Sequence, residues 1–482
     1  MLTSRRPWWQ GGVLYQLYPR SFADSNDDGV GDLAGIRGRL DYLGWLGVDG
    51  IWLNPTFPSP NEDWGYDVSD YCDVHPELGT LADLDGLIAE AGDRDIRILL
   101  DLVPAHTSDR HEWFLDSRSS RAAQKRRWYI WRDEADDQLS VFGGSAWAYD
   151  ETTGQYYHHR FLLEQPDLNW IGGEMRDAFD DILRFWFDRG VAGFRIDVVH
   201  ALVKDPPGHA NLPAINDVLR HWRALANEYE PQPLLIGETW VMELEKLAAF
   251  YGNGSDQLHL AFNFPFMFAG LDAGALAGVV RRTEELMPPD ASLVWALSNH
   301  DVVRFPTRIC EEDDARVKCA LVILLGLPGT PVLYYGDELG LHQVQVPDDR
   351  VLDVHGRDGA RTPMPWGDVD WQAPWLPLGE GVASVAVQRE DPSSILSFCR
   401  ELIALRRRRT ELSHGRYEQL DAPAGVWAWR RGQETVVAIN LTAQPAQLDL
   451  GGEVILSTSG RRESRGLGPW EGVVVSTGRM SP

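Results

Sequence analysis

Short apolar runs of β type recur along the chain, and most are followed by a turn and by a stretch with the apolar spacing of an amphipathic helix. This alternation is typical of a parallel α/β architecture. A (β/α)8 TIM barrel is predicted, because such runs occur eight times. The candidate strands are Val13–Pro19, Gly50–Pro55, Arg97–Pro104, Gly193–Val198, Leu234–Glu238, Leu258–Asn263, Leu293–Asn299 and Pro331–Gly336.

Two segments depart from this alternation. Residues 105–167, rich in Trp, Tyr, Gly, His and charge, follow the third strand, and a loop of that length is usually functional or a small subdomain. After the helical run Ile395–Arg409, short alternating segments separated by Gly, Pro and Asn predict an antiparallel β domain. We expect a barrel in two parts, 1–104 and 168–409, an inserted subdomain at 105–167 and a C-terminal β-sandwich at 410–482.

The composition limits the class of protein. The chain has 482 residues, 44% hydrophobic and 24% charged, as in a globular protein large enough for a catalytic domain with accessory modules. Its net charge of −27 repels phosphate backbones and anionic lipid surfaces, which argues against nucleic acid, a membrane or an acidic substrate as a partner, with a local basic patch as the alternative. The 20 Trp and 14 Tyr residues favour carbohydrate as a ligand, since aromatic faces pack on sugar rings.

The cysteines and the apolar runs bear on the cellular location. Cys72, Cys310, Cys319 and Cys399 are too sparse and too irregularly spaced for a disulfide framework or a metal site, which favours reduced thiols. The first residues contain no apolar run of a secretory signal. The longest apolar stretch, Cys319–Leu327, is shorter than the ~18 to 20 residues that span a bilayer. We expect a cytoplasmic protein, and the sequence leaves its oligomeric state open.

Several predicted strands end in ionisable residues, as in LLDLVPAH, FRIDVVH, LLIGET and LSNHD. The carboxyl ends of barrel strands converge on one face, where the active site is built. Asp197 and Glu238 each end a strand predicted to be buried, and a carboxyl group is costly to bury unless it is paired or functional. One such acid is usually an ion-pair partner, but two carboxyl groups on one face suit glycoside hydrolysis.

Other polar residues at strand ends support this interpretation. Arg195 lies two residues before Asp197, so both side chains point to the same face of an extended strand. A cation there keeps Asp197 ionised, as a nucleophile requires. His106, His300 and Asp301 stand at the ends of further strands. Each has an ordinary explanation as a hydrogen-bonded structural residue, but their occurrence at successive strand ends favours a common site.

Five motifs, DLVPAH, EQPDLNW, GFRIDVV, GETW and SNHD, occur in one order along the chain. In these motifs the chain resembles the α-amylase family, glycoside hydrolase family thirteen, and within it the oligosaccharide-acting α-glucosidase branch. The resemblance runs from about Trp9 to beyond Trp366. It implies Asp197 as nucleophile, Glu238 as general acid/base and Asp301 as a third carboxylate that binds sugar hydroxyls. Because the family retains anomeric configuration, the two catalytic carboxyl groups are expected ~5 to 5.5 Å apart.

The same resemblance implies a pocket for the terminal glucose. Asp63 is expected to pair with an arginine of GRDGARTPMPW; we assign Arg357, with Arg361 as the open alternative. A pair that grips the terminal hydroxyls implies exo-action on short substrates. The expected walls are Tyr66, Phe142 and Phe161, and the expected hydrogen-bonding residues are His106, Gln165, Arg195 and His300. The alternative for Phe142 and Phe161 is a place in the core of the inserted subdomain.

The segment DSNDDGVGD indicates a separate metal site. Asp24, Asn26, Asp28 and Asp32 supply side-chain oxygens at alternating positions, and Val30 adds a carbonyl. Hard oxygen ligands at this spacing suit Ca²⁺, although the bidentate Glu of an EF-hand is missing. The segment resembles the calcium loop of the α-glucosidase branch. We expect a structural calcium ion, with a metal-free acidic turn as the alternative, and no organic cofactor.

The predicted function is a retaining, exo-acting α-glucosidase that releases glucose from the non-reducing end of short α-glucosides through a covalent glucosyl-Asp197 intermediate. A transglucosidase, an isomerase or an oligo-1,6-glucosidase would use the same carboxylates. A non-catalytic carbohydrate-binding relative usually lacks one of the three acids, which are all present here. Val198 resembles the residue type that often accompanies α-1,6 acceptance. We still favour α-1,4 or mixed linkage, since one methyl-for-hydroxyl change contributes only ~1 to 3 kcal/mol.

Overall fold

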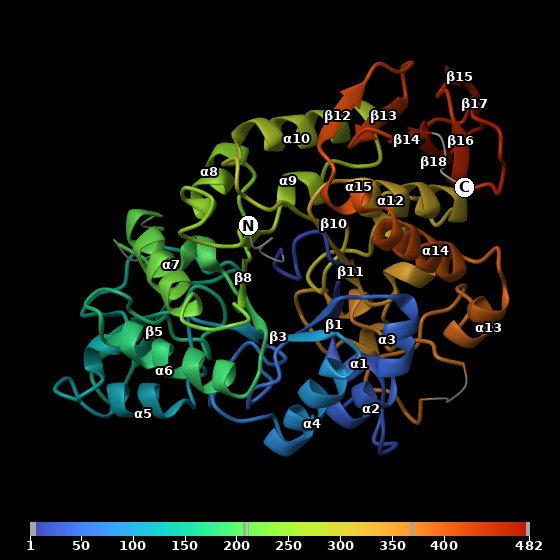
Figure 1. Cartoon of the computed structure of the whole chain (residues 1–482). Helices are drawn as coiled ribbons and strands as arrows, with labels where there is room; N and C mark the ends of the chain where they lie inside the picture. The colour runs from blue at the N-terminus through green and yellow to red at the C-terminus, as the bar shows by residue number, and fades with distance from the viewer. Residues whose placement is uncertain (1–5, 206–208, 211, 368–370, 479–482) are drawn as a thin grey trace.

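Eight parallel strands form the central sheet of the computed structural model, which describes residues 6–205, 209–210, 212–367 and 371–478 (Figure 1). All eight predicted strands are confirmed, but most are shorter than predicted, because their polar carboxyl ends leave the ladder and enter loops. The strands are β1 (Leu14–Leu17), β2 (Gly50–Leu53), β3 (Arg97–Leu102), β7 (Gly193–Ile196), β8 (Leu234–Gly237), β9 (Leu260–Ala261), β10 (Val294–Ala296) and β11 (Thr330–Tyr334).

The order of the strands is that of a (β/α)8 barrel. The sheet runs β10-β11-β1-β2-β3-β7-β8-β9, so neighbours in the chain are neighbours in space and β11 returns to β1. Leu14 of β1 faces Gly50 on one side and Val332 on the other. The TIM-barrel fold class predicted from the sequence is therefore confirmed.

Amphipathic helices cover the sheet. In α6, Met175, Phe179, Ile182, Leu183 and Trp186 are buried, and their spacing of three and four residues forms one apolar stripe. The helices between the strands include α2 (Leu33–Gly38), α3 (Leu40–Leu46), α4 (Leu81–Gly92), α6 (Glu174–Asp188), α7 (Leu212–Ala226), α10 (Ala273–Leu286) and α12 (Asp314–Gly326).

The insertion after β3 forms a small antiparallel sheet in the order β4 (Trp131–Arg132), β6 (Gln155–His158), β5 (Trp147–Asp150), beside helix α5 (Glu112–Ser119). It projects from one side of the barrel (Figure 1). Its two ends lie together, since His106 and Asp167 form an antiparallel bridge. The predicted domain limits stay a prediction, and their ends at residues 1 and 482 lie outside the described residues.

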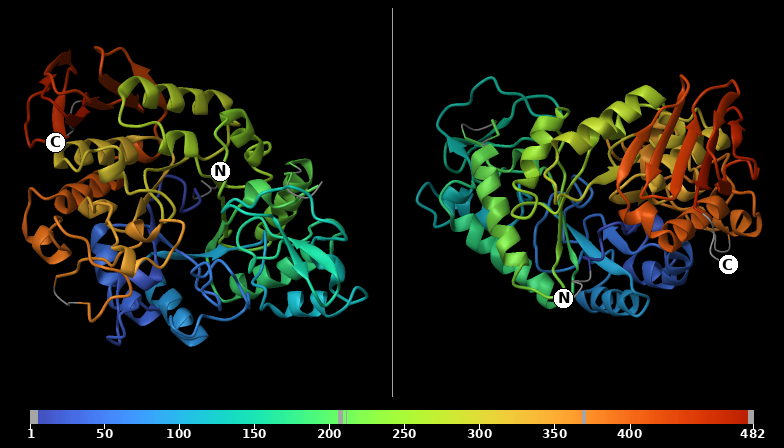
Figure 2. Two further views of the ribbon diagram at one scale, coloured as in Figure 1. Left: turned by 180° about the vertical axis from the view of Figure 1, so that it is seen from behind. Right: turned by 45° about the horizontal axis from the view of Figure 1, so that its top comes forward.

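The C-terminal part contains the predicted antiparallel β domain. Its main sheet has the order β12 (Tyr417–Leu420), β13 (Val426–Arg431), β14 (Thr435–Asn440), β18 (Glu471–Ser476), β16 (Glu453–Ser457), seen side by side in Figure 2. A second pair is β15 (Ala446–Asp449) with β17 (Arg465–Leu467). The indole N–H of Trp429 donates to the carbonyl of Gly326 at 3.2 Å, so this domain packs on the end of α12. Packing against both barrel and sheet explains why α12 is apolar nearly all round.

The cysteines and helices agree with the sequence in two respects. All four cysteines are free thiols, and three of them are buried. Within the described ranges, no helix has both the length and the apolar composition that a membrane crossing requires.

Candidate active site

A cavity of about 550 Å³ opens at the carboxyl ends of the barrel strands. All the predicted catalytic and glucose-pocket residues except Gln165 and Arg195 line it, namely Asp63, Tyr66, His106, Phe142, Phe161, Asp197, Glu238, His300, Asp301 and Arg357. Gln165 and Arg195 are buried behind this wall and contact residues that form it. The structure therefore brings the predicted residues together in one place.

Backbone bonds beyond the strand ends fix the two predicted catalytic acids. The N–H of Asp197, after β7, donates to the carbonyl of Leu102 at 2.8 Å. The N–H of Glu238, after β8, donates to the carbonyl of Ile196 at 2.9 Å. Each side chain therefore starts from a rigid position at the rim of the barrel.

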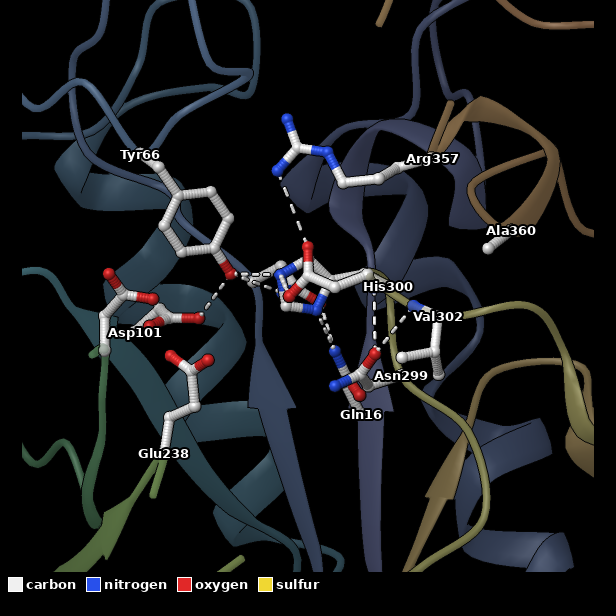
Figure 3. A network of polar contacts seen from close by, with 12 residues as sticks. Gln16, Tyr66, Asp101, Glu238, Asn299, His300, Val302, Arg357 and Ala360 are labelled. Atoms are coloured by element: carbon white, nitrogen blue, oxygen red, sulfur yellow. Dashed lines mark hydrogen bonds and ion pairs between the residues drawn. The ribbon is translucent and has the colours of Figure 1, made fainter. Parts of the chain in front are cut away.

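Arg195 links the carboxyl groups. Its Nη1 lies 2.7 Å from Oδ1 of Asp197 and 2.8 Å from Oδ1 of Asp101, and its Nη2 lies 2.9 Å from Oε2 of Glu238. Figure 3 shows Glu238 and Asp101 turned toward the same space, with Tyr66 above them. Asp197 and Glu238 thus share one cavity and one guanidinium.

Three carboxyl groups around one guanidinium favour retention of a proton. Burial raises the pKa of Asp197; Arg195 lowers it, and Glu238 and Asp101 raise it again, so that it lies well above its usual value. Burial likewise raises the pKa of Asp101 to about 6, against the lowering effect of Arg195. The cluster can therefore hold a proton near neutral pH. Glycoside hydrolysis requires this, because one carboxyl group must be protonated while the other is ionised.

Val198 connects the loops after β7 and β8. Its N–H donates to Oε2 of Glu238 at 2.8 Å. It adopts φ of +45°, a left-handed conformation that is rare for a β-branched residue. Backbone strain of this kind persists only where neighbouring contacts hold it, and it is common at functional sites.

Asp301 lies opposite, among basic groups. Its carboxylate is 3.1 Å from Nη2 of Arg361 and 3.1 Å from Nε2 of His300. Burial raises the pKa of Asp301, but His300, Arg361 and Arg357 together hold it below its usual range. Asp301 is therefore held in its ionised form, which accepts hydrogen bonds.

The rings of His300 and Tyr66 stack with centroids 5.3 Å apart (Figure 3). Nδ1 of His300 lies 2.8 Å from the amide nitrogen of Gln16, and Nε2 lies 2.6 Å from the hydroxyl of Tyr66. If the Gln16 amide donates, the imidazole proton is on Nε2 and faces the cavity. Burial lowers the pKa of His300 well below its usual value, so the ring is neutral.

Asp63 pairs with Arg357, not with Arg361. Nη2 of Arg357 is 2.6 Å from Oδ1 of Asp63, and a two-bonded fork to Asp353 at 2.8 and 2.9 Å fixes its guanidinium. Arg361 instead donates to the carbonyl of His300 at 2.9 Å. The alternative left open by the sequence is therefore decided in favour of Arg357.

Gln165 and His106 complete this end of the cavity. The amide of Gln165 donates to Oδ2 of Asp63 at 2.9 Å and lies 3.1 Å from Nε2 of His106. Phe161 packs against the His106 ring with centroids 5.5 Å apart. Phe142 and Phe161 line the cavity, as predicted, although both belong to the insertion.

Sequence reasoning missed several residues of the site. Asp101 lies inside the motif LLDLVPAH. Its position near the end of a predicted strand could have indicated that it belongs to the site. His355 stacks on Phe142 with ring centroids 3.6 Å apart, and it stands just before the segment GRDGARTPMPW, which could have indicated it. The other unpredicted polar or aromatic wall residues are Arg160, His200 and Trp240.

The predicted metal ligands lie in one loop before α2. Asp24 accepts hydrogen bonds from the N–H groups of Asn26 and Gly29, at 3.0 and 2.8 Å. Asp28 accepts from the N–H of Val30 at 2.8 Å. Asp32 caps α2, accepting from the N–H of Gly35 at 2.6 Å. Across the described parts of the chain, no group of three His, Cys, Asp or Glu side chains is arranged to hold a metal, so calcium stays a prediction.

Known proteins share both this sequence and this fold. The family model described as alpha amylase, catalytic domain, matches residues 16–415. A probable alpha-glucosidase of Rhizobium meliloti is 37% identical, over 93% of this chain and 92% of its own length. A glucan 1,6-alpha-glucosidase of Streptococcus pneumoniae is 36% identical, over 97% of this chain and 99% of its own length.

A solved structure supports the same assignment. The crystal structure of an alpha-glucosyl transfer enzyme matches with a TM-score of 0.91 and 35% identity, over 98% of this chain and all of that one. Sequence motifs, strand order and relatives matched along nearly their whole length therefore agree that the chain belongs to the α-amylase family, and that it is a glycoside hydrolase.

Proposed function

We propose that the protein is a retaining, exo-acting α-glucosidase that releases glucose from the non-reducing end of short α-glucosides. The observation that carries the proposal is that Asp197 and Glu238 line one cavity and both contact Arg195. Two carboxyl groups held in this way suit a double displacement at the anomeric carbon.

In the first step, Asp197 attacks the anomeric carbon and forms an ester bond with it. Glu238 gives its proton to the glycosidic oxygen as that bond breaks, so the leaving group departs as an alcohol. In the second step, the Glu238 carboxylate takes a proton from water, the water oxygen bonds to the anomeric carbon, and the ester to Asp197 breaks. Two inversions give net retention.

The proton required for the first step is supported by the charges of the cluster. Asp101, Asp197 and Glu238 surround a single guanidinium, so ionisation of all three would leave an excess of negative charge in a buried site. Burial and the neighbouring acids raise the pKa of Asp197, and Arg195, which lies 2.7 Å from this carboxyl group, lowers it. In the proposed mechanism we assign the proton of the first step to Glu238, which shares the guanidinium of Arg195 with Asp197.

The exo mode is supported by the pair of Asp63 and Arg357. Both line the cavity, and their 2.6 Å contact presents acceptors and donors suited to adjacent hydroxyls of a terminal sugar. A longer chain extending past this pair would have to break it. Short substrates with the glucose unit bound against Asp63 and Arg357 fit this arrangement.

Transfer of glucose to a sugar, and preference for the α-1,6 bond, are the second candidate functions. The similarity to an alpha-glucosyl transfer enzyme and to a glucan 1,6-alpha-glucosidase favours them, and Val198 lines the cavity beside Glu238. We infer α-1,4 or mixed specificity. Initial rates with maltose and isomaltose, and the products formed at high maltose, separate these functions.

The anomer released first tests the central proposal. Proton NMR of the reaction with an α-glucoside should show α-glucose before mutarotation, and a 2-deoxy-2-fluoro or 5-fluoro glucosyl fluoride should add one sugar mass to the peptide containing Asp197. Release of β-glucose as the first product would contradict a retaining mechanism. Labelling of another acid would contradict the role given to Asp197.

We also propose that the loop 24–32 binds calcium. Its donor set of carboxylate, amide and carbonyl oxygens suits a hard cation, and Oδ2 of Asp24 and Oδ1 of Asp28 each accept one N–H bond, which leaves a lone pair for an ion. The ion would be held by Asp24, Asn26, Asp28, Asp32 and the carbonyl of Val30. It would tie the loop together, and no step of hydrolysis passes through it.

A further inference from the structure

Arg160 differs from the other arginines at the cavity. Nowhere in the described part of the chain does a carboxylate form an ion pair with it, and its Nε is buried without a hydrogen-bond partner. It nevertheless lines the cavity, in a protein with 72 acidic residues against 45 basic ones. Arg357, which also lines the cavity, pairs with Asp63. Arg195 and Arg361, which lie behind the wall, pair with Asp197 and Asp301, so the ion pair is what Arg160 lacks.

Arg160 belongs to the Glu238 side of the cavity. Its carbonyl accepts from the N–H of Val141 at 2.9 Å, which fixes its backbone to the loop after β4. Arg160 and His200 line the same cavity. Burial lowers the pKa of His200, Glu238 raises it in part, and the charge of Arg160 lowers it again. Nδ1 of His200 lies 3.3 Å from the backbone nitrogen of Trp240 and 3.5 Å from the carbonyl oxygen of Glu238, so His200 is next to Glu238.

Lys204, the other cation nearby, is already satisfied. Its ammonium lies 3.3 Å from Oδ1 of Asp167 and 3.3 Å from the carbonyl of Ala105. The free charge in this corner is therefore that of Arg160. A guanidinium that is partly withdrawn from water without an anion is unfavourable, unless a ligand supplies one.

The position of Arg160, His200 and Trp240 in the cavity indicates which part of a substrate they would contact. The terminal glucose lies between Asp63 and Arg357 at one end in the proposed function, and the leaving group departs beside its proton donor, Glu238. Arg160, His200 and Trp240 therefore face the leaving group, or the acceptor that later replaces it. Trp240 is 39% exposed, which gives the corner an apolar face for a ring.

We propose that Arg160, with His200 beside it, binds an anionic group, a carboxylate or a phosphate, carried by the leaving group of the substrate or by the acceptor. The inference rests on the proposed α-glucosidase function and names a substrate class for its site. Guanidinium groups recognise both anions through paired N–H donors. The imidazole of His200 adds a second polar group that lines the same cavity.

The test compares matched substrates that differ in charge. One pair is 4-carboxyphenyl and 4-carbamoylphenyl α-glucoside; the other is maltose with and without a 6-phosphate on its reducing glucose. Arg160→Gln should lower the charged-to-neutral ratio of kcat/KM about tenfold or more relative to wild type. Intrinsic differences between leaving groups cancel in this comparison. A fall in the first pair alone assigns a carboxylate, and a fall in the second alone assigns a phosphate.

Two variants control the comparison. Arg127→Gln removes the same charge from an exposed position of the insertion outside the cavity, and should leave the ratio unchanged. Arg160→Lys keeps the charge and should restore most of the ratio. Unchanged ratios in Arg160→Gln for both pairs, with a wild-type melting temperature, would overturn the inference.

Binding separates this inference from the proposed function. Titration calorimetry of 4-hydroxybenzoate and 4-hydroxybenzamide needs no turnover; wild type should prefer the benzoate, and Arg160→Gln should lose that preference. If no glucoside is cleaved, the proposed function fails, while the calorimetry still decides the role of Arg160. Equal affinities of the wild type for both ligands, together with equal kcat/KM for maltose and its phosphate, would overturn the inference that Arg160 binds an anion.

Discussion

The backbone N–H of Val198 donates a 2.8 Å hydrogen bond to Oε2 of Glu238. The residue that follows one of the two proposed catalytic acids thereby orients the other, and it does so from a left-handed conformation with φ of +45°. The side chain of Val198 also lines the cavity. A change at this position therefore acts on the acid/base geometry and on the space for the leaving group together.

Substitution of Val198 by Thr should shift linkage preference toward maltose over isomaltose. The hydroxyl replaces a methyl group at nearly constant size. Such a change alters the discrimination between two substrates by ~1 to 3 kcal/mol, or about 5- to 150-fold in the ratio of their kcat/KM values. Val198→Ala is the control, because it removes methyl groups without adding a donor. An identical ratio in wild type and Val198→Thr would remove this residue from linkage selection.

Glu238→Gln should lower turnover of maltose by roughly 10²-fold or more, because the amide cannot protonate the leaving oxygen. The loss should be much smaller for an aryl glucoside with an acidic phenol, which leaves without a proton. Glu243→Gln, at an exposed position five residues later, is the matched control. Equal losses on both substrates would exclude Glu238 as the general acid.

Asp101→Asn should move the acidic limb of the kcat/KM profile to lower pH. The negative charge of Asp101 raises the pKa of Asp197, so its removal lowers that pKa, and Asp197 stays ionised at more acidic pH. Asp70→Asn, at an exposed position, should leave the limb in place. A limb that moves to higher pH would show that Asp101 acts chiefly by holding Arg195.

Arg357→Lys should lower kcat/KM for disaccharides by about 10- to 100-fold, since lysine cannot bridge Asp63 and the fork of Asp353. Combining it with Asp63→Asn should add little further loss, because both changes break one contact. Fully additive losses, measured in the same double-mutant cycle, would mean that the two residues bind the substrate independently.

How much of this site is readable from sequence depends on how local its determinants are. Asp197, Glu238 and Asp301 follow strands whose apolar runs are visible, and a barrel brings such strand ends together whatever the details of packing. The motif of each residue lies within a few neighbours in the chain. The three acids and the eight strands were therefore predictable.

Other relationships depend on segments far apart in the chain. His355 meets Phe142 only because the insertion folds back over the loop after β11, and no local pattern records that contact. Arg357 and Arg361 are four residues apart with similar surroundings in sequence. Their partners, Asp63 and Asp301, are set by loop conformation, which a motif does not specify. Arg160 likewise has no ion-pair partner among the described residues because the fold brings no carboxylate close to its guanidinium, and a local motif does not record that.

Removal of calcium should lower the melting temperature if loop 24–32 holds the ion, since a ligand bound only by the native state stabilises it by mass action. Melting curves with excess chelator and with added Ca²⁺ should differ in wild type by about 1 to 2 °C, which is what ~1 to 2 kcal/mol gives in a chain of this size. Asp28→Ala should abolish the difference, because Asp28 faces solvent and bonds only within its own loop. Asp27→Ala, in the same loop but outside the predicted ligand set, should retain it. Coincident wild-type curves would mean that the hydrogen bonds within the loop suffice to shape it, and that its acidic residues are a turn without a metal.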